Sequence, residues 1–281
     1  MITAIIVAYN SNGSIVPCLK AAFDSGVDRV IIWDNNPEDG LSALVKAEIP
    51  LTEIEIYTSG RNLGFGSAIN KALKFAGDDD LIILLNPDCI LNAECVSALT
   101  SAVADPEIGL VSPRMMYESG DYGFSGGSKP TLIKELLALT ELDELLPRPL
   151  RRLAVDLVTS RRGRPSYNAS AVAGGPLTVD WVSGFCVAAR VATLKTVDGF
   201  DSEFFLYFED VDISLRVGYA GLTNLVVRDV AALHYESTSM SRGRKSKYYR
   251  EGMWTYFRKH GTRAERAATS LVHRRPRGGA M

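Results

Sequence analysis

The sequence has little of what would mark several classes of protein. Its four cysteines, Cys18, Cys89, Cys95 and Cys186, are scattered, with no CxxC pair and none near histidine at zinc-ligand spacing. Neither a disulfide framework nor a zinc site is indicated, and a reducing compartment is expected. No uninterrupted apolar run reaches the ~18 residues needed to cross a bilayer, and the N-terminus lacks the basic start of a signal peptide. We expect a cytoplasmic protein, or one that at most lies at the inner face of the cell membrane.

An excess of one charge is also missing. The 31 Lys and Arg residues balance 33 Asp and Glu residues to a formal net charge of -2, which argues against a surface built for nucleic acid. From Arg242 onward, however, twelve basic residues accompany only two acids, Glu251 and Glu265. Arginines also follow a leucine-rich stretch within residues 129–167. Two interpretations stay open for these segments: a core-packing helix with a solvated basic tail, or an amphipathic surface that docks on anionic lipid.

The first half of the chain alternates predicted strands and helices, which indicates βαβ units and a mostly parallel sheet. Strands are predicted at residues 2–8, 30–33, 54–57, 81–85 and 110–112. Helices are predicted at residues 15–23, 41–48, 68–75 and 93–104. After residue 116 the rhythm changes to a glycine-rich loop, a strand over 179–189, a helix over 210–217, a short strand at 225–227 and a helical tail from about 245 to 258. The fold class is therefore α/β, without an internal repeat or a clear domain linker.

Polar residues collect where the predicted strands end. The first strand ends in Tyr9 and Asn10, the second in residues 34–36, and the fourth in residues 86–89. Asn and Asp commonly form turns and caps, and this interpretation stays open for Asn10 or Asn35 taken singly. Because ligands bind beyond the carboxyl ends of parallel strands, several such ends on one edge favour a binding site.

Each of these ends suits a step in nucleotide binding. Asp34 suits hydrogen bonds from a base or ribose. Gly64 and Gly66 would let backbone N–H groups approach a diphosphate, which Arg61 would also contact, although a simple loop explains such glycines as well. Asp88 follows an apolar strand and suits a divalent ion that bridges two phosphates.

A second acidic cluster follows five bulky apolar residues, 204–208. An acid in such an apolar cleft can serve as a general base, which makes Glu209 and Asp210 candidates. The alternative is structural, with Asp210 capping a helix and Asp212 pairing with Arg216 one turn later. His234, one of only three histidines, is either structural or a metal ligand.

The ordered set of motifs resembles glycosyltransferase family 2, which has the GT-A fold. The matching pieces are residues 7–10, 34–36, 62–66 with Asn70, 86–88, 181–184, 199–201, 204–212 with Arg216, and His234. The subgroup that the chain most resembles is bacterial rhamnosyltransferases of cell-wall and O-antigen assembly, many of which carry the same Asn-Pro-Asp.

The resemblance implies a dTDP- or UDP-linked sugar donor, Mg²⁺ or Mn²⁺, and specific residue roles. The implied donor contacts are Ala8, Tyr9, Asn10, Asp34, Arg61, Asn62, Gly64, Gly66, Asn70 and Asn86. The implied metal ligands are Asp88 and His234, the catalytic pair is Asp210 as base with Glu209 beside it, and the acceptor contacts are Trp181, Gly184 and Asp212. One departure is that Asn86 replaces the first acid of the family's Asp-x-Asp.

The expected function is therefore an inverting, metal-dependent transfer of a sugar, such as rhamnose, to a saccharide or lipid-linked saccharide. Residues 1–116 would form the nucleotide-sugar half, 117–244 the acceptor and catalytic half, and 245–281 a basic helical tail. A homodimer is left open. The alternatives are a UDP-sugar-dependent transferase and a non-catalytic sugar-nucleotide-binding subunit. A nucleotidyltransferase is disfavoured because no glycine-rich loop with arginine follows the first strand, and a dinucleotide oxidoreductase because the glycines follow the third.

Overall fold

A mixed sheet of nine strands forms the centre of the structure, a computed structural model that describes residues 1–50, 52–140, 169–235 and 242–273. The strands lie in the order β3 (Ile54–Thr58), β2 (Arg29–Asp34), β1 (Ile2–Ala8), β4 (Leu81–Leu85), β10 (Cys186–Arg190), β6 (Ile108–Met116), β11 (Thr223–His234) and β5 (Cys89–Ile90), with β8 (Leu177–Val179) paired to β11. Two short strands, β7 (Gly126–Gly127) and β9 (Trp181–Val182), pair with each other.

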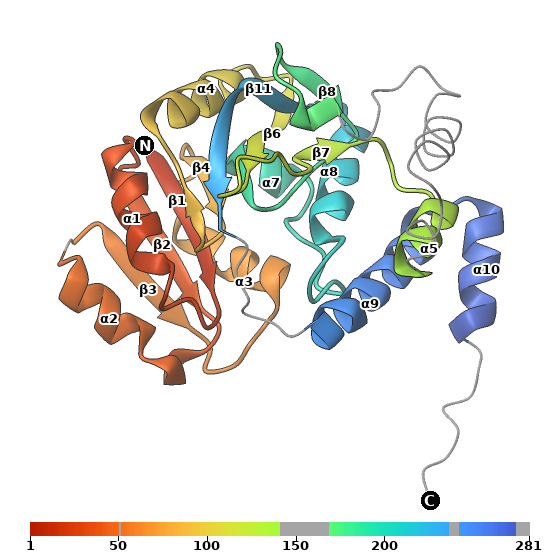
Figure 1. Cartoon of the computed structure of the whole chain (residues 1–281), viewed down its shortest axis with the longest axis horizontal. Helices are drawn as coiled ribbons and strands as arrows, with labels where there is room; N and C mark the ends of the chain where they lie inside the picture. The colour runs from red at the N-terminus through yellow and green to blue at the C-terminus, as the bar shows by residue number, and fades with distance from the viewer. Residues whose placement is uncertain (51, 141–168, 236–241, 274–281) are drawn as a thin grey trace, which may run out of the picture.

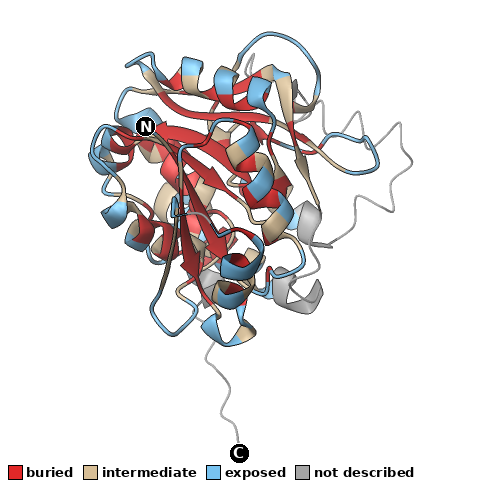
Figure 2. Cartoon of the chain, turned by 90° about the vertical axis from the view of Figure 1, so that its left-hand side faces the viewer, coloured by how far each residue is buried: buried red, intermediate tan, exposed pale blue. Residues whose placement is uncertain are grey.

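Helices cover both faces of this sheet (Figure 1). They are α1 (Ile15–Asp24), α2 (Leu41–Glu48), α3 (Phe65–Ala72), α4 (Ala93–Val103), α5 (Leu132–Thr140), α7 (Val191–Thr196), α8 (Glu209–Tyr219), α9 (Arg242–His260) and α10 (Arg263–His273). Helices α1, α2 and α4 share a core with Ala4 and Ile6 of β1, whereas α3, α7 and α8 share another with Ile5 and Val7. Successive strand residues point to opposite faces, so both faces of β1 are buried. Figure 2 shows buried strands beneath helices whose outer faces are exposed.

The predicted βαβ rhythm of the first half is confirmed. Strands β1, β2, β3 and β4 pair in parallel, so their carboxyl ends meet at one edge of the sheet. Strand β10 then joins β4 antiparallel, which makes the complete sheet mixed. This is the α/β fold class that the sequence predicts, and it places the polar strand ends side by side.

The second half corrects two strand predictions. The predicted single strand over residues 179–189 is three strands, because β8 pairs with β11, β9 with β7, and β10 with β4. The change of partner occurs at Asp180, whose carboxylate accepts the N–H of Lys129 at 2.7 Å. The predicted short strand at 225–227 is the long β11, which follows β6 in parallel and carries His234 to the sheet edge.

The helical tail is confirmed, and it belongs to the core. Met253, Tyr256 and Phe257 of α9 are almost fully buried in a third apolar cluster, which includes Val211 and Leu215 of α8. Most of the leucine- and arginine-rich stretch and the last eight residues lie outside the described residues. Among the helices described, none is both long and apolar enough to cross a membrane. The proposed division of the chain at residues 116 and 244 stays a prediction.

Candidate active site

A cavity of about 160 Å³ opens at the sheet edge where the strand ends meet. Its walls come from the ends of β1 and β2, the loop before α3, the turn after β4 and the segment before α8. The lining residues are Val7, Tyr9, Ser11, Asn35, Asn62, Gly64, Phe65, Asn86, Pro87, Asp88, Phe205 and Leu206. The structure thus brings together five of the predicted donor and metal residues, namely Tyr9, Asn62, Gly64, Asn86 and Asp88. We refer to this space as the sheet-edge cavity.

Asn35 shapes one wall of the sheet-edge cavity by holding the loop before α3. Its Oδ1 accepts the N–H of Leu63 and its Nδ2 donates to the carbonyl of Gly64, both at 3.1 Å. Asn62 closes the same loop, since its Oδ1 accepts the N–H of Gly64 at 2.8 Å. Asn35 therefore has a structural role, because its side chain holds the loop before α3.

The two loop glycines are required by close packing. Gly64 has a φ of 82°, and a Cβ there would lie 2.3 Å from the carbonyl oxygen of Phe205. A Cβ on Gly66 would lie 2.8 Å from Cβ of Phe200. The N–H of Phe65 donates to the carbonyl of Phe205 at 2.9 Å, so this N–H is already used within the protein. Close packing against Phe205 and Phe200 therefore accounts for these two glycines without the expected approach to a diphosphate. Gly66 also lies outside the wall of the sheet-edge cavity.

Three predicted donor contacts from the strand ends do not line the cavity. Ala8 is fully buried in the core against α1, because the alternation along β1 turns Val7 and Tyr9 to the cavity instead. Asp34 is 2% exposed and its Oδ1 accepts the N–H of Asn36, while burial raises the pKa of its carboxyl. Asn10 is exposed, and its side-chain oxygen accepts from the side-chain amide of Asn36 at 2.7 Å, which joins the loops that follow β1 and β2.

Two further predictions also fall outside the cavity. The side chain of Asn70 bonds both backbone groups of Phe200, accepting its N–H at 2.8 Å and donating to its carbonyl at 2.7 Å. This amide therefore fixes the backbone of Phe200, and its predicted contact with the donor stays a prediction. Arg61 is exposed in the same loop and does not line the cavity, and its contact with a phosphate stays a prediction.

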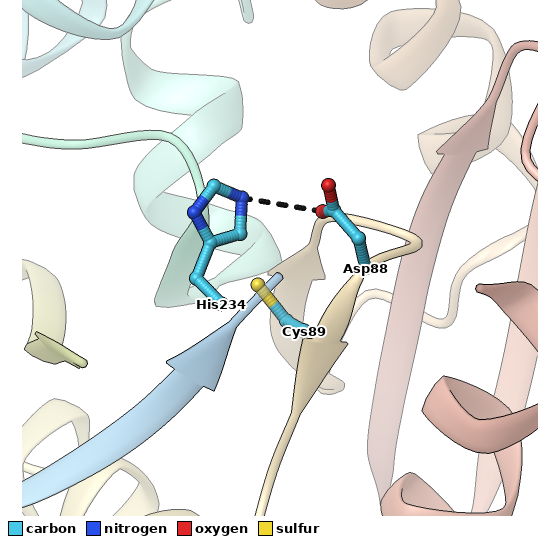
Figure 3. A group of neighbouring side chains, drawn as sticks. All are labelled: Asp88, Cys89 and His234. Carbon is cyan, nitrogen blue, oxygen red and sulfur yellow. Dashed lines mark ion pairs between the residues drawn. The ribbon is translucent and has the colours of Figure 1, made fainter. Parts of the chain in front are cut away.

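The turn after β4 faces the end of β11 across the sheet edge. Oδ1 of Asp88 lies 3.2 Å from Nε2 of His234, and the two side chains point toward each other (Figure 3). The amide of Asn86 lies 3.5 Å from the same nitrogen. The rings of Phe185 and Tyr117 flank the imidazole, so its orientation is fixed by packing. Two residues that are 146 positions apart thus form the pair that the resemblance implies as metal ligands.

The chemistry of this pair fits a divalent cation. One ligand atom each from Asp88, Cys89 and His234 lies within 4.8 Å of the others. A carboxylate and an imidazole suit Mn²⁺, and Mg²⁺ is commonly held by one or two carboxylates together with substrate phosphates. Cys89 is fully buried, its thiol donates to the carbonyl of Phe185 at 3.5 Å, and burial raises the pKa of this thiol well above its ordinary value, which disfavours the thiolate that would bind a metal. Asn86 adds an amide where an acid would add charge.

The predicted base is held by backbone N–H groups. Oδ2 of Asp210 accepts the N–H of Gly184 at 3.0 Å, and Oδ1 accepts the N–H of Val211 at 2.8 Å. Burial raises the pKa of Asp210, although these hydrogen bonds act in the opposite direction. A Cβ on Gly184 would lie 3.4 Å from both Asp210 and Phe65, which lines the sheet-edge cavity. Gly184 therefore positions the carboxylate beside that cavity.

The neighbouring acid, Glu209, lies deeper in the protein. It is 5% exposed, and its Oε2 has no hydrogen-bond partner in the described part of the chain. Burial raises the pKa of Glu209 well above its ordinary value, and the nearby charge of Asp210 raises it further. This carboxyl therefore favours its neutral, protonated form. Its predicted catalytic contribution stays a prediction.

Asp212 belongs to a buried ion-pair network. It is 1% exposed, and its carboxylate contacts Nε of Arg216 at 2.8 Å and Nε2 of His260 at 2.7 Å. These bonds join α8 to the end of α9. The predicted pairing of Asp212 with Arg216 is therefore confirmed, while its predicted contact with the acceptor stays a prediction.

A second cavity, of about 230 Å³, lies on the other side of the segment before α8. Its lining residues are Phe124, Ser128, Pro130, Lys134, Glu135, Trp181, Ser183, Tyr207, Phe208, Asp210, Val211 and Tyr249. Residues 205 and 206 line the first cavity, whereas 207 and 208 line this one. Asp210 and the predicted acceptor contact Trp181 both border the second space, which we refer to as the α5–α9 cavity.

Sequence reasoning missed much of both walls. The apolar run 204–208 is visible in the sequence, but its division between two cavities depends on the backbone turn at Tyr207 and Phe208, which both have a φ of 68°. Glu135 and Tyr249 come from helices that only the tertiary fold brings together. A motif search could not have found this pair.

The sequence also matches known proteins. The model of the family described as "Glycosyl transferase family 2" matches residues 3–153. N-acetylglucosaminyl-diphospho-decaprenol L-rhamnosyltransferase of Mycobacterium tuberculosis is 28% identical over 224 residues, which cover 76% of this chain and 68% of that protein. Rhamnosyltransferase WbbL of Escherichia coli is 28% identical over 189 residues, which cover 64% of this chain and 63% of WbbL.

Similarity to a solved structure extends over nearly the entire chain. GalNAc-T7, solved with UDP, GalNAc and Mn²⁺, superposes with a TM-score of 0.59 at 11% identity and covers 98% of this chain. The chain spans 58% of the GalNAc-T7 chain. At this identity the likeness concerns the fold, and the predicted GT-A fold is confirmed.

Proposed function

The chain belongs to glycosyl transferase family 2, and on that premise we propose that it transfers L-rhamnose from dTDP-rhamnose to a saccharide carried on a polyprenyl diphosphate. The observation that carries the proposal is that Asp88, at the wall of the sheet-edge cavity, lies 3.2 Å from Nε2 of His234. The relatives named as rhamnosyltransferases support the sugar, and the one named for a diphospho-decaprenol acceptor supports the lipid.

In this proposal the sheet-edge cavity holds the donor. Asp88 and His234 would hold a divalent cation, which when bound supplies positive charge against the departing nucleoside diphosphate. Tyr9 and Asn62 line the same space and would contact the nucleotide. The carboxylate would supply the one charged ligand and the imidazole a neutral nitrogen, while Asn86 would supply only an amide.

Asp210 would take the proton from the acceptor hydroxyl as its oxygen attacks the anomeric carbon. The N–H groups of Gly184 and Val211 keep the carboxylate in one orientation, so it needs little rearrangement during the reaction. No enzyme nucleophile is required, because the acceptor oxygen forms the new bond as the bond to the diphosphate breaks. We therefore expect a single displacement that inverts the anomeric configuration.

A lipid-linked acceptor implies work at a membrane surface, and we propose such contact near α5. Ile133 is 69% and Leu136 38% exposed on this helix, and Phe124, which lines the α5–α9 cavity, is 39% exposed. Vesicles of anionic phospholipid should therefore sediment the protein, and replacing Ile133 by Asp should weaken the binding. Equal recovery of both proteins in the supernatant at low salt would contradict the contact.

Calorimetric titration with dTDP and with UDP, each with and without Mn²⁺, tests the donor half of the proposal. We expect dTDP to bind more tightly than UDP, and its affinity to rise with Mn²⁺ in the wild type but not in Asp88→Asn. Tighter binding of UDP would move the donor to a UDP-sugar. Binding without turnover of dTDP-rhamnose, by hydrolysis or transfer, would favour a non-catalytic subunit.

A further inference from the structure

The α5–α9 cavity has one wall in which a carboxylate and a phenol meet from separate helices. The hydroxyl of Tyr249 on α9 donates to Oε2 of Glu135 on α5. Both residues line the cavity together with Asp210. The ring of Tyr249 packs against those of Tyr207 and Phe208, with centroids 5.8 and 5.1 Å away, so the phenol is held in place from the other side.

The rest of this cavity has the composition of a saccharide site. Trp181 lines it, and its indole N–H donates to the carbonyl of Ser128 at 3.1 Å, which fixes the plane of the ring. Aromatic faces pack against the apolar C–H face of a sugar ring, while a few placed polar groups fix its orientation. A carboxylate accepts hydrogen bonds from sugar hydroxyls, and a phenol can both donate and accept.

We propose that Glu135 and Tyr249 recognise hydroxyl groups of the acceptor sugar and so select which saccharide is presented to Asp210. This inference rests on the proposed function, since it assigns an acceptor to the cavity that Asp210 borders. It adds to that function two specificity-determining residues and a hydroxyl-bearing sugar ring as their ligand.

A purely structural role explains the pair less well. The segment around the start of α5 is already attached to the C-terminal helices by two other hydrogen bonds. Nζ of Lys129 donates to the carbonyl of His260 at 2.9 Å, and the N–H of Leu132 donates to Glu265 at 3.0 Å. If Glu135 and Tyr249 only added a third attachment between these helices, their side chains would not need to line a cavity. The carboxyl of Glu135 also lies in a water-poor site, and this burial raises its pKa.

The test compares Glu135→Gln and Tyr249→Phe with the wild type. The first variant keeps the shape of the side chain, and the second keeps the ring that packs on Tyr207 and Phe208. In transfer from dTDP-rhamnose to N-acetylglucosaminyl diphosphate with a short alkyl tail, we expect acceptor KM to rise about tenfold or more. Donor KM should stay within about twofold. Lys247→Ala, at an exposed position of α9, the helix that carries Tyr249, is the matched control.

A binding measurement separates this inference from the proposed function. Methyl glycosides of several sugars are titrated onto the protein saturated with dTDP, with the fluorescence of Trp181 as signal and Trp181→Phe as the blank. We expect at least one glycoside to bind the wild type, and to bind both variants about tenfold more weakly.

The outcomes are distinct. Equal glycoside affinities in wild type and both variants, or no binding of any glycoside, would overturn the role of the pair, whatever the transfer assay gives. Glycoside binding that the variants weaken, without transfer to the named acceptor, would support the pair and contradict the proposed substrate. Melting temperatures near that of the wild type would show that the weakened binding does not come from lost folding.

Discussion

The backbone N–H of Gly184 donates to Oδ2 of Asp210 at 3.0 Å, across 26 residues of sequence. Gly184 lies in the turn between β9 and β10, and Asp210 lies in the first turn of α8. The bond fixes one carboxylate oxygen, and the N–H of Val211 fixes the other. The sheet and the helix thus hold the predicted base jointly at the boundary between the two cavities.

Replacing Asp210 by Asn should abolish most of the chemistry while leaving the donor site intact. An amide cannot take the proton of the acceptor hydroxyl, so kcat should fall by roughly 10²-fold or more. Asp210 is not part of the wall of the sheet-edge cavity, and the affinity for dTDP should stay within about twofold. Transfer kinetics and calorimetry measure the two effects.

Asp229→Asn, at an exposed position of β11, is the matched control and should keep normal turnover. The wild type should also lose activity on acidification at a pH above the ordinary aspartate pKa of 3.8, because burial raises the pKa of Asp210 and a protonated carboxyl cannot act as a base. Near-normal kcat in Asp210→Asn would remove it from the mechanism.

Glu209 should make the protein less stable as the pH rises. In the unfolded chain this carboxyl ionises near its ordinary pKa of 4.5, whereas burial raises its pKa well above that in the folded protein. Its stabilising contribution is therefore complete below the unfolded pKa and is lost as the pH rises through the folded pKa. We expect the free energy of unfolding of Glu209→Gln, relative to the wild type, to increase as the pH is raised from about 5.

Urea denaturation across this pH range measures the difference. Glu203→Gln serves as a control of opposite sign, because hydrogen bonds from Lys259 and Arg258 lower the pKa of Glu203. That carboxylate contributes stability above its unfolded pKa and loses it only on acidification. A constant difference between Glu209→Gln and wild type at every pH would contradict the buried, protonated state.

The sequence predicts the parallel half of the fold well because its strands are apolar runs bounded by turn residues, as in residues 2–8 and 81–85. It also predicts the sheet edge that holds Tyr9, Asn86 and Asp88, since the ends of parallel strands meet there. It cannot predict which face each side chain takes at that edge. Ala8 points into the core shared with α1, whereas Val7 and Tyr9 on the other face line the cavity.

The tertiary partners of several polar side chains cannot be predicted from the sequence. Asn70 looks like a donor contact in the motif, yet its amide is engaged by the backbone of Phe200, 130 residues away. The acid of Asp212 likewise meets His260 from a helix whose position the sequence does not specify. Such contacts depend on tertiary packing, and so does the pairing of Glu135 with Tyr249.

His234→Ala should remove most of the effect of metal on donor binding. If the imidazole is a ligand, its loss should reduce the gain in dTDP affinity produced by Mn²⁺ by about tenfold or more, since even an outer partner of a metal ligand is worth that much. Affinity without metal should change little. The measurement is calorimetric titration of dTDP with and without Mn²⁺.

Cys89→Ala provides the matched control beside the same pair. The thiol of Cys89 is buried and donates to the carbonyl of Phe185, so its removal should leave the effect of Mn²⁺ unchanged. The opposite pattern, with the metal effect lost in Cys89→Ala and kept in His234→Ala, would exclude His234 as a ligand.

Gly64→Ala should damage both the fold and the donor site. The position has a φ of 82° and a ψ of -177°, a region essentially confined to glycine that costs an L-residue about 1–3 kcal/mol, and the new Cβ would also lie 2.3 Å from the carbonyl oxygen of Phe205. Gly60 in the same loop has a φ of 73° with nothing within 4 Å of a Cβ, so Gly60→Ala tests a positive-φ backbone without the clash. Because overpacking typically adds about 1–3 kcal/mol, we expect Gly64→Ala to lose that much more unfolding free energy than Gly60→Ala.

Urea denaturation of both variants measures the difference. Equal losses would mean that the loop can move away from Phe205, and affinity for dTDP would then be expected to survive in both variants.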